Sequence, residues 1–335
     1  MNSLNTQFVE PAELTGFVRG TIDALQDNDV LSTVLPPESV QNISVRFRVG
    51  ETGLVPEASP RDWDAEPDIG SLPGGKRRTV DLIPISRRIP VMESDAIIAR
   101  VAGNDQYSAL VYDAAAAAAR SIYERVRSLR GTVLATGRAT LNLSNYGMDE
   151  DFGRDPELTA TLSNLATSGT GSLLDELAAF VEIYEEKNGG VRPERAFASS
   201  KIINAFTRHS DFAFSNAQQV TKRVTVADVN EILVDHNLPQ LVRFNEATAS
   251  GKILPEDRLI MVPSAERASE LGSTAWGLTE SAFKPEFFPS GQATPGPVAA
   301  VWTQPGTAGK TVADADSTVL PFLKNANLSA ALKVI

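Results

Sequence analysis

The chain has 335 residues, with 42 acidic and 31 basic side chains and a formal net charge of −11. It contains no cysteine, which excludes disulfides, thiolate nucleophiles, iron–sulfur clusters and cysteine-based zinc sites. Its two histidines, His209 and His236, lie too far apart in the sequence for a compact metal-binding motif. An acidic chain is also poorly suited to wrapping nucleic acid with its bulk surface, because phosphate neutralisation requires clustered Lys and Arg.

The N-terminal region lacks the basic and apolar parts of a signal peptide. The longest apolar run, Ala114–Ala119, is far shorter than the ~20 residues of a membrane helix. We therefore expect a soluble protein with no membrane partner, made in a reducing cytoplasm. Residues 11–26 place apolar side chains at helical spacing after Pro11 and predict a first helix. Residues 42–49 alternate between apolar and polar side chains, which indicates a half-exposed strand, and residues 79–86 are a second strand candidate.

The stretch between these two strands is rich in proline and has little capacity to form a core. A loop of this length inside a compact domain is usually functional or disordered. Its composition leaves two interpretations open. One is a disordered insertion, and the other is an arm that buries its apolar residues only against another subunit. The apolar residues that would make this inter-subunit contact are Leu54, Trp63, Ile69 and Leu72.

The strongest helical pattern covers residues 105 to 136, where apolar side chains recur every three or four positions. Gly103-Asn104 supplies a break and a cap before it, and Gly137 supplies a stop after it. A helix of this length spans about 45 Å, whereas helices in globular proteins average three or four turns. The pattern therefore predicts a long helix that acts as a structural spine.

Shorter elements follow the spine. Residues 138–143 alternate like a strand, and residues 145–154 carry turn chemistry. Residues 173–187 form an amphipathic helix closed by Asn188-Gly189-Gly190. Further strands are predicted at 196–198, 241–244, 259–262 and 328–335, and further helices at 199–207 and 226–236. Because helices and strands mix without regular βαβ alternation, the order favours an α+β architecture.

Charge is divided between opposite blocks. The block from residue 73 to 90 is basic, and the block from 149 to 190 is acidic. Blocks of opposite sign are often solvated faces, but they also suit head-to-tail contact between copies of one chain. The basic candidates for such a contact are Lys76, Arg77, Arg78, Arg87 and Arg88. The acidic candidates are Asp149, Glu150, Asp151, Asp155, Glu182, Glu185 and Glu186.

No motif in the chain predicts catalysis. Residues 304–311 resemble a phosphate-binding loop, but Gln304 stands where the first glycine is required. The acidic cluster 149–151 lacks the pattern of a calcium loop, and the basic residues 76–78 lack interleaved aromatics for nucleic-acid binding. Neither histidine sits in a catalytic motif. We therefore predict no catalytic residues, no cofactor and no metal ligand.

Four segments resemble motifs of a known family. They are Gly137-Arg138-Ala139 at the end of the spine, Met148–Arg154 (MDEDFGR), Ala275–Glu280 (AWGLTE) and Ser317–Ala326 (STVLPFLKNA). Together with the arm and the spine, their order resembles the major capsid proteins of tailed bacteriophages, which have the Hong Kong 97-type fold. Within that fold, the chain is most similar to the lambda-type family, major capsid protein E.

The resemblance implies a division of the chain into regions. Residues 1–42 would form an N-terminal arm, and residues 43–90 an extended loop over a neighbouring subunit. Residues 91–164 and 276–335 would form a peripheral domain around the spine helix, and residues 165–275 an axial domain.

The resemblance also implies a non-enzymatic protein that assembles as pentamers and hexamers into an icosahedral head around double-stranded DNA, without sequence-specific binding. Its partners would be copies of itself, a portal, a scaffold or protease, and cement proteins. It would reside in the virion after assembly in the host bacterial cytoplasm. Two alternatives stay open: an encapsulin-like nanocompartment with an enzyme cargo, and a cytosolic α+β enzyme with His209 or His236 in a deep pocket.

Overall fold

The computed structural model describes residues 3–4, 9–49, 58–66, 76–143, 146–165, 171–212, 224–305 and 310–334. The chain folds into two compact units, and the boundary between them falls within one long helix. The first unit comprises Met1–Val45, Thr79–Arg130 and Ser273–Phe322. The second comprises Arg46–Arg78, Gly131–Gly272 and Leu323–Ile335. Both units combine helices with a sheet, so the predicted α+β class is confirmed.

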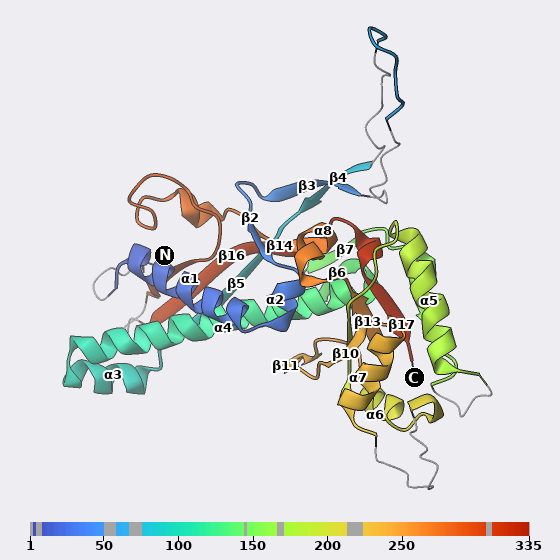
Figure 1. Ribbon diagram of the computed structural model, residues 1–335. Coiled ribbons are helices and arrows are strands. Elements are labelled where there is room, and N and C mark those ends of the chain that lie inside the picture. The colour runs from blue at the N-terminus through green and yellow to red at the C-terminus, as the bar shows by residue number, and fades with distance from the viewer. Residues whose placement is uncertain are drawn as a thin grey trace. The chain divides into compact units, whose positions relative to one another are not determined.

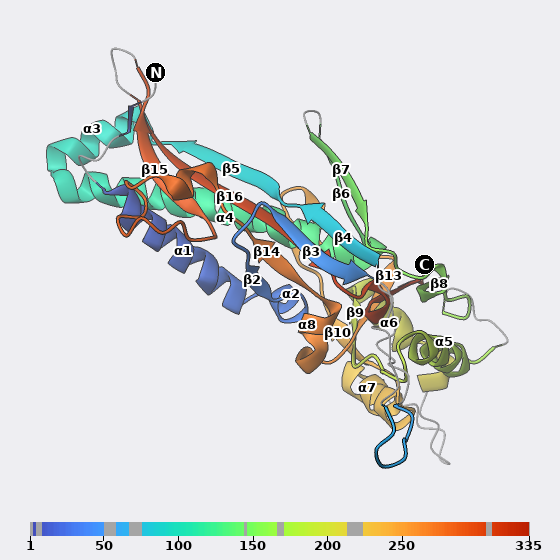
Figure 2. The ribbon, with the colours of Figure 1, turned by 90° about the horizontal axis from the view of Figure 1, so that it is seen from above.

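The first unit is built on a six-stranded sheet. Its strands run in the order β1-β15-β16-β14-β2, and β5 pairs with β16. Figure 2 shows β15, β16 and β5 side by side. The strands are β1 (Ser3–Leu4), β2 (Pro37–Ser39), β5 (Ile83–Pro90), β14 (Gly272–Trp276), β15 (Val298–Thr303) and β16 (Thr311–Leu323).

The two faces of this sheet have separate cores, because side chains alternate along each strand. On one face, Ala299, Val301, Ala313 and Ala315 pack with helices α1 (Pro11–Asp27) and α4 (Asn104–Thr136). On the other face, Val298 and Ala300 pack with Ala282 and Phe287. Two shorter helices, α2 (Val30–Val34) and α3 (Glu93–Ala102), complete the unit.

The long helix α4 has 33 residues, which confirms the predicted spine. It begins after Gly103, whose φ of +133° breaks the chain away from α3. It ends at Gly137, whose φ of +70° lets its N–H donate to the carbonyl of Val133 at 2.8 Å. This is the left-handed glycine stop that the sequence indicates. Within the part of the chain that the structure describes, no helix is both long and apolar enough to span a membrane.

A fully buried guanidinium ties α2, α4 and β14 together in the first unit. Arg130 donates to Asp29 at 3.0 Å, to Ser32 at 2.7 Å and to Thr274 at 2.9 Å. The hydroxyl of Tyr123 also donates to Asp29, at 2.9 Å. A buried charge is tolerated only when it is paired and hydrogen-bonded. The network therefore fixes where these three elements meet.

The second unit is built on a five-stranded sheet in the order β10-β9-β13-β17-β8. Helices α5 (Leu173–Lys187), α6 (Ser200–Phe206) and α7 (Val226–Asp235) share its core. Figure 1 shows α6 and α7 beside β10, which both contact. The strands are β8 (Thr159–Thr161), β9 (Arg195–Ala198), β10 (Gln240–Arg243), β13 (Arg258–Val262) and β17 (Ala330–Lys333). A short helix, α8 (Ala268–Leu271), and the hairpin β11 (Ala247–Thr248) with β12 (Gly251–Lys252) complete it.

Several predicted elements have different bounds in the structure. The strand predicted at 79–86 is two strands, β4 (Lys76–Asp81) and β5, which divide at Leu82; β4 pairs with β3 (Ser44–Val49). Residues 145–154, predicted as a turn, contain β7 (Tyr146–Asp151), which pairs with β6 (Arg138–Leu143). The pattern predicted neither of the helices α2 and α3, because both are short and α3 has no side-chain N-cap.

We predict that Arg130→Met lowers the free energy of unfolding by about 3 kcal/mol, because it leaves the Asp29 carboxylate buried without its main cation. Urea unfolding of the purified chain measures this. Arg138→Met is the matched control: Arg138 is 43% exposed and pairs with Asp149 at the surface, so its removal should cost far less than the removal of Arg130. Equal losses in the two variants would contradict the structural role of Arg130.

Candidate functional site

The predicted inter-subunit residues lie mainly on β4, on β5 and in residues 58–66. Leu54, Ile69 and Leu72 lie outside the described residues, as does the side chain of Lys76, whose backbone begins β4. The indole of Trp63 is 97% exposed, and every residue from 58 to 66 is exposed. Burying a tryptophan removes a large apolar area from water, so this side chain is available for a partner.

The four remaining arginines differ in their surroundings. Arg77 and Arg87 are exposed. Arg78 donates to the backbone carbonyl of Asp151 in the same chain. Arg88 donates from its Nε to Asp314 on the neighbouring strand, at 3.1 Å. Two of these basic side chains are thus partly satisfied within the chain, and two present their charge to solvent.

The predicted acidic surface is largely paired inside its own unit. Arg138 bonds Asp149 at 2.8 Å and Asp151 at 3.2 Å. The bond to Arg138 holds the pKa of Asp149 below its usual value. Lys187 bonds Asp155 at 2.9 Å and likewise lowers the pKa of that carboxyl. Among the described residues, the predicted acids without an ion pair are Glu150, Glu182 and Glu186, while Glu185 bonds Arg192.

This internal pairing bears on the predicted contact between basic and acidic blocks. An exposed pair gains little energy in water, and a carboxylate that already has a cation gains less from a second. The contact between copies stays a prediction. Glu150, Glu182 and Glu186 are the predicted acids whose charge is not balanced by an ion pair among the described residues.

The MDEDFGR segment has a structural role that its composition did not reveal. Phe152 is buried, with its ring centroid 6.4 Å from that of Phe47. Gly153 has a φ of +77° and donates its N–H to Asp151 at 2.8 Å. That turn directs Arg154 back to the end of α4, where it donates to the carbonyl of Leu134 at 2.6 Å. The segment therefore caps the spine helix with a cation, which the helix dipole favours.

Arg258 supports the same helix end, donating to the carbonyl of Ala135 at 3.2 Å. Burial, and secondarily the charge of Arg258, lowers the pKa of Arg154 to about 10. Arg154 therefore remains charged at neutral pH. Two guanidinium groups at one helix terminus are tolerated because each bonds carbonyls that otherwise lack intrahelical partners.

The AWGLTE segment passes through a crowded part of the first unit. Trp276 is 5% exposed, and the N–H of Gly277 donates to the carbonyl of Thr318 at 2.8 Å. A Cβ on Gly277 would lie 2.5 Å from Leu82 Cδ1 and 2.6 Å from the carbonyl oxygen of Asn42. Only glycine fits this position, so the segment is constrained by packing rather than by chemistry.

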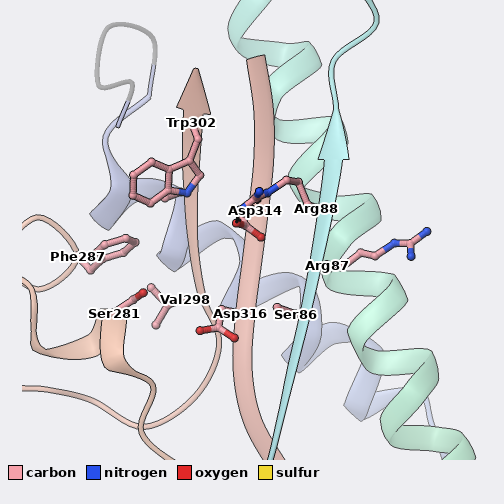
Figure 3. Close-up of a pocket in the computed structure, with 10 residues that line it drawn as sticks. Ser86, Arg87, Arg88, Ser281, Phe287, Val298, Trp302, Asp314 and Asp316 are labelled. Atoms are coloured by element: carbon pink, nitrogen blue, oxygen red, sulfur yellow. Dashed lines mark hydrogen bonds and ion pairs between the residues drawn. The ribbon is translucent and has the colours of Figure 1, made fainter. Parts of the chain in front are cut away.

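A mixed polar and aromatic cavity of about 350 Å³ lies on the face of the first sheet opposite α1 and α4. Asp314 and Asp316 of β16 face it, together with Phe287 and Trp302 (Figure 3). Burial, and secondarily the charge of Asp314, raises the pKa of Asp316. In Figure 3 the Arg87 side chain points away from this pair, and Arg88 approaches Asp314.

A second, more apolar cavity of about 350 Å³ lies between α3 and the start of α4. A third, of about 350 Å³, lies beside α1 and is lined by Arg19, Trp276 and several prolines. The linings of these three cavities include neither histidine. His209 instead accepts from the N–H of Asp211 at 3.3 Å, and His236 follows the last turn of α7. Both placements agree with structural histidines.

Comparison with known proteins identifies the fold. No protein-family model and no curated protein sequence matches the chain. Among solved structures, one assigned as the capsid protein of a prophage of E. coli CFT073 covers 100% of both chains, with a TM-score of 0.61 and 10% identity. A phage-related protein from Bordetella bronchiseptica RB50 covers 99% of this chain and 97% of its own, with a TM-score of 0.53 and 12% identity.

A third structure is the procapsid of satellite phage P4, which includes the size determination protein. It covers 94% of this chain and 99% of its own, with a TM-score of 0.50 and 10% identity. The chain therefore has the fold of phage capsid proteins, as the resemblance implied. The narrower assignment to the lambda-type family stays a prediction.

We predict that Gly277→Ala destabilises the chain by about 2 kcal/mol, because the added methyl group overlaps Leu82 and a backbone carbonyl. Thermal unfolding is the measurement. Gly147→Ala on β7 serves as the control, since a Cβ there meets nothing within 4 Å. If both substitutions shift the midpoint equally, the close approach at Gly277 does not limit stability.

Proposed function

We propose that this chain is the major capsid protein of a tailed bacteriophage, which self-assembles into the icosahedral shell of the phage head. The observation that carries the proposal is the likeness along 100% of both chains to a structure assigned as a prophage capsid protein. Because the likeness extends over the whole length, the proposal rests on the complete fold and not on a single region of the chain.

The surface of the chain supports assembly by physical argument. Trp63 stands exposed on a segment with no core of its own, and α3 exposes further aliphatic side chains. A contiguous apolar surface such as that of α3 is typical of interaction sites, and the Trp63 indole offers a large apolar area to a partner. In the proposal, residues 43–90 form the extended loop that lies over a neighbour, and residues 1–42 form the N-terminal arm. Residues 91–164 with 276–335 form the peripheral domain, and residues 165–275 the axial domain.

The finer parts of the proposal follow from the lambda-type resemblance. Copies would form pentamers and hexamers, with a portal, a scaffold or protease and cement proteins as partners, and would reside in the virion. The net charge of −11 is compatible with enclosing DNA, because a container needs no strong attraction to its content. The role is structural and requires no catalytic group or cofactor.

Electron microscopy of the purified recombinant chain tests the proposal. We expect closed shells or ring-shaped capsomers. Shells from the native source that contain DNA support a phage head, whereas shells that contain an enzyme cargo identify a nanocompartment. A compact monomer that forms no particles under any assembly condition overturns the proposal.

We predict that Trp63→Ala weakens assembly while the monomer stays as stable as the wild type. The indole is 97% exposed, so its removal costs the monomer little, whereas the loss of an aromatic anchor at an interface costs about 2 kcal/mol or more, roughly a thirtyfold change. Light scattering measures assembly, and urea unfolding measures stability. Val234→Ala, at an exposed valine of α7, is the control. An equal loss of stability and assembly would contradict the prediction.

A further inference from the structure

The helix α3 has an apolar surface that its own unit does not cover. Ile97, Ile98 and Val101 are 57%, 66% and 85% exposed, and Met92, just before the helix, is 63% exposed. Residues three and four apart share a helix face, so the three aliphatic side chains form one stripe. The opposite side of α3 packs inward through Ala99, which is 4% exposed. The helix thus has a second apolar face besides the one that anchors it.

A cavity adjoins this stripe. Its volume is about 350 Å³, and its walls include Val91, Met92, Ile97 and Tyr107. Its charged lining residues are Glu93, Arg100 and Lys310, which leaves one net positive charge. The guanidinium of Arg100 lies 4.8 Å from the ring centroid of Tyr107, and the Tyr107 hydroxyl donates to Thr311 at 2.6 Å. The site is therefore an apolar hollow with a rigid aromatic floor and a cationic rim.

Residues 58–66 have complementary chemistry. The carbonyl of Asp62 accepts from the N–H of Ala65 at 3.2 Å, which places Trp63 and Asp64 at the tip of a turn. Arg61 donates to the carbonyl of Ala65, so its charge is directed back onto the turn. Three acids and one arginine give the segment two net negative charges. The turn therefore presents a fully exposed indole between two carboxylates.

We infer that the cavity beside α3 is the acceptor site for the Trp63 turn of a second copy of this chain. The indole enters the apolar hollow, and Asp62 and Asp64 meet the cationic rim at Arg100 and Lys310. The donor is a second copy because residues 58–66 are exposed throughout in their own chain. This inference rests on the proposed function, and it identifies the surface on which the extended loop of a neighbour docks.

The chemistry of the two surfaces favours docking of the Trp63 turn over contact between two α3 stripes. Two copies of α3 face to face would bury only aliphatic side chains and would bring no aromatic group to the cavity. The Trp63 turn instead brings opposite charge and an aromatic anchor to a pocket, which is the usual composition of an interface hot spot. Rim charges also guide the approach of the two copies.

Site-directed cross-linking tests the inference, because the chain has no native cysteine to interfere. One preparation carries Asp64→Cys and a second carries Ile98→Cys. The two are mixed under assembly conditions and oxidised with diamide, and non-reducing electrophoresis reports the disulfide-linked dimer. Trp63 is left intact in both. The matched control replaces Ile98→Cys with Val234→Cys, which places an exposed thiol on a helix of the other unit.

We expect at least tenfold more dimer between the Asp64→Cys and Ile98→Cys chains than in the control mixture, and loss of that excess when Trp63→Ala is added. Equal yields in the two mixtures overturn the inference. A disulfide that forms only when both substitutions are in one chain also overturns it, because the contact is then within a single copy.

The outcome is distinguishable from failure of the proposed function. Particles seen by electron microscopy without the specific cross-link refute this acceptor site and leave the capsid assignment standing. The absence of any particles refutes the assignment itself.

Discussion

The first unit depends on close packing between α4 and its sheet. Small side chains on both partners allow the helix and the strands to approach: Ala114, Ala115, Ala118 and Ala119 on α4, and Ala299, Ala313 and Ala315 on β15 and β16. Dispersion is significant only at short range, so a bulky residue on either surface would separate the layers. A helix of 33 residues also loses much conformational entropy on folding and needs a partner along its length. The alanine run, which carries no chemistry of its own, is what allows that partner to come close.

The completeness of this packing explains why the residues proposed for assembly contacts stand exposed. The core of each unit is complete without Trp63 or the stripe of α3, as their exposure shows. Such residues contribute little to the stability of one copy. In the proposed shell, their burial in a repeated contact would stabilise the assembly instead. The proposal thereby assigns folding and assembly to different side chains.

The sequence was most informative where hydrophobic periodicity was regular over many residues. The spine and the helix at 173–187 came from hydrophobic periodicity, the α+β class came from the order of the elements, and all are confirmed. β7 was missed because its turn residues and acids suggested a loop, whereas pairing with Arg138 of β6 stabilises it as a strand. Helix α3 was missed because it has only 10 residues and no side-chain N-cap to mark where it begins. Contacts between distant segments, such as Arg130 with Asp29, cannot be predicted from one sequence.

The acidic block, residues 149–190, shows most clearly that the fold decides which charged residues are available to a partner. From composition alone, every carboxylate between residues 149 and 190 is equally available to a neighbour. In the fold, Arg138, Lys187 and Arg192 form ion pairs with five of the carboxylates in that block. Among the described residues, the acids of this block that form no ion pair are Glu150, Asp175, Glu176, Glu182 and Glu186, and each is worth little alone in water. A shell built from many copies can nevertheless use such weak contacts, because once one contact forms the next is intramolecular and benefits from a high effective concentration. In such a shell local charge would set register and approach, and apolar anchors would supply most of the affinity.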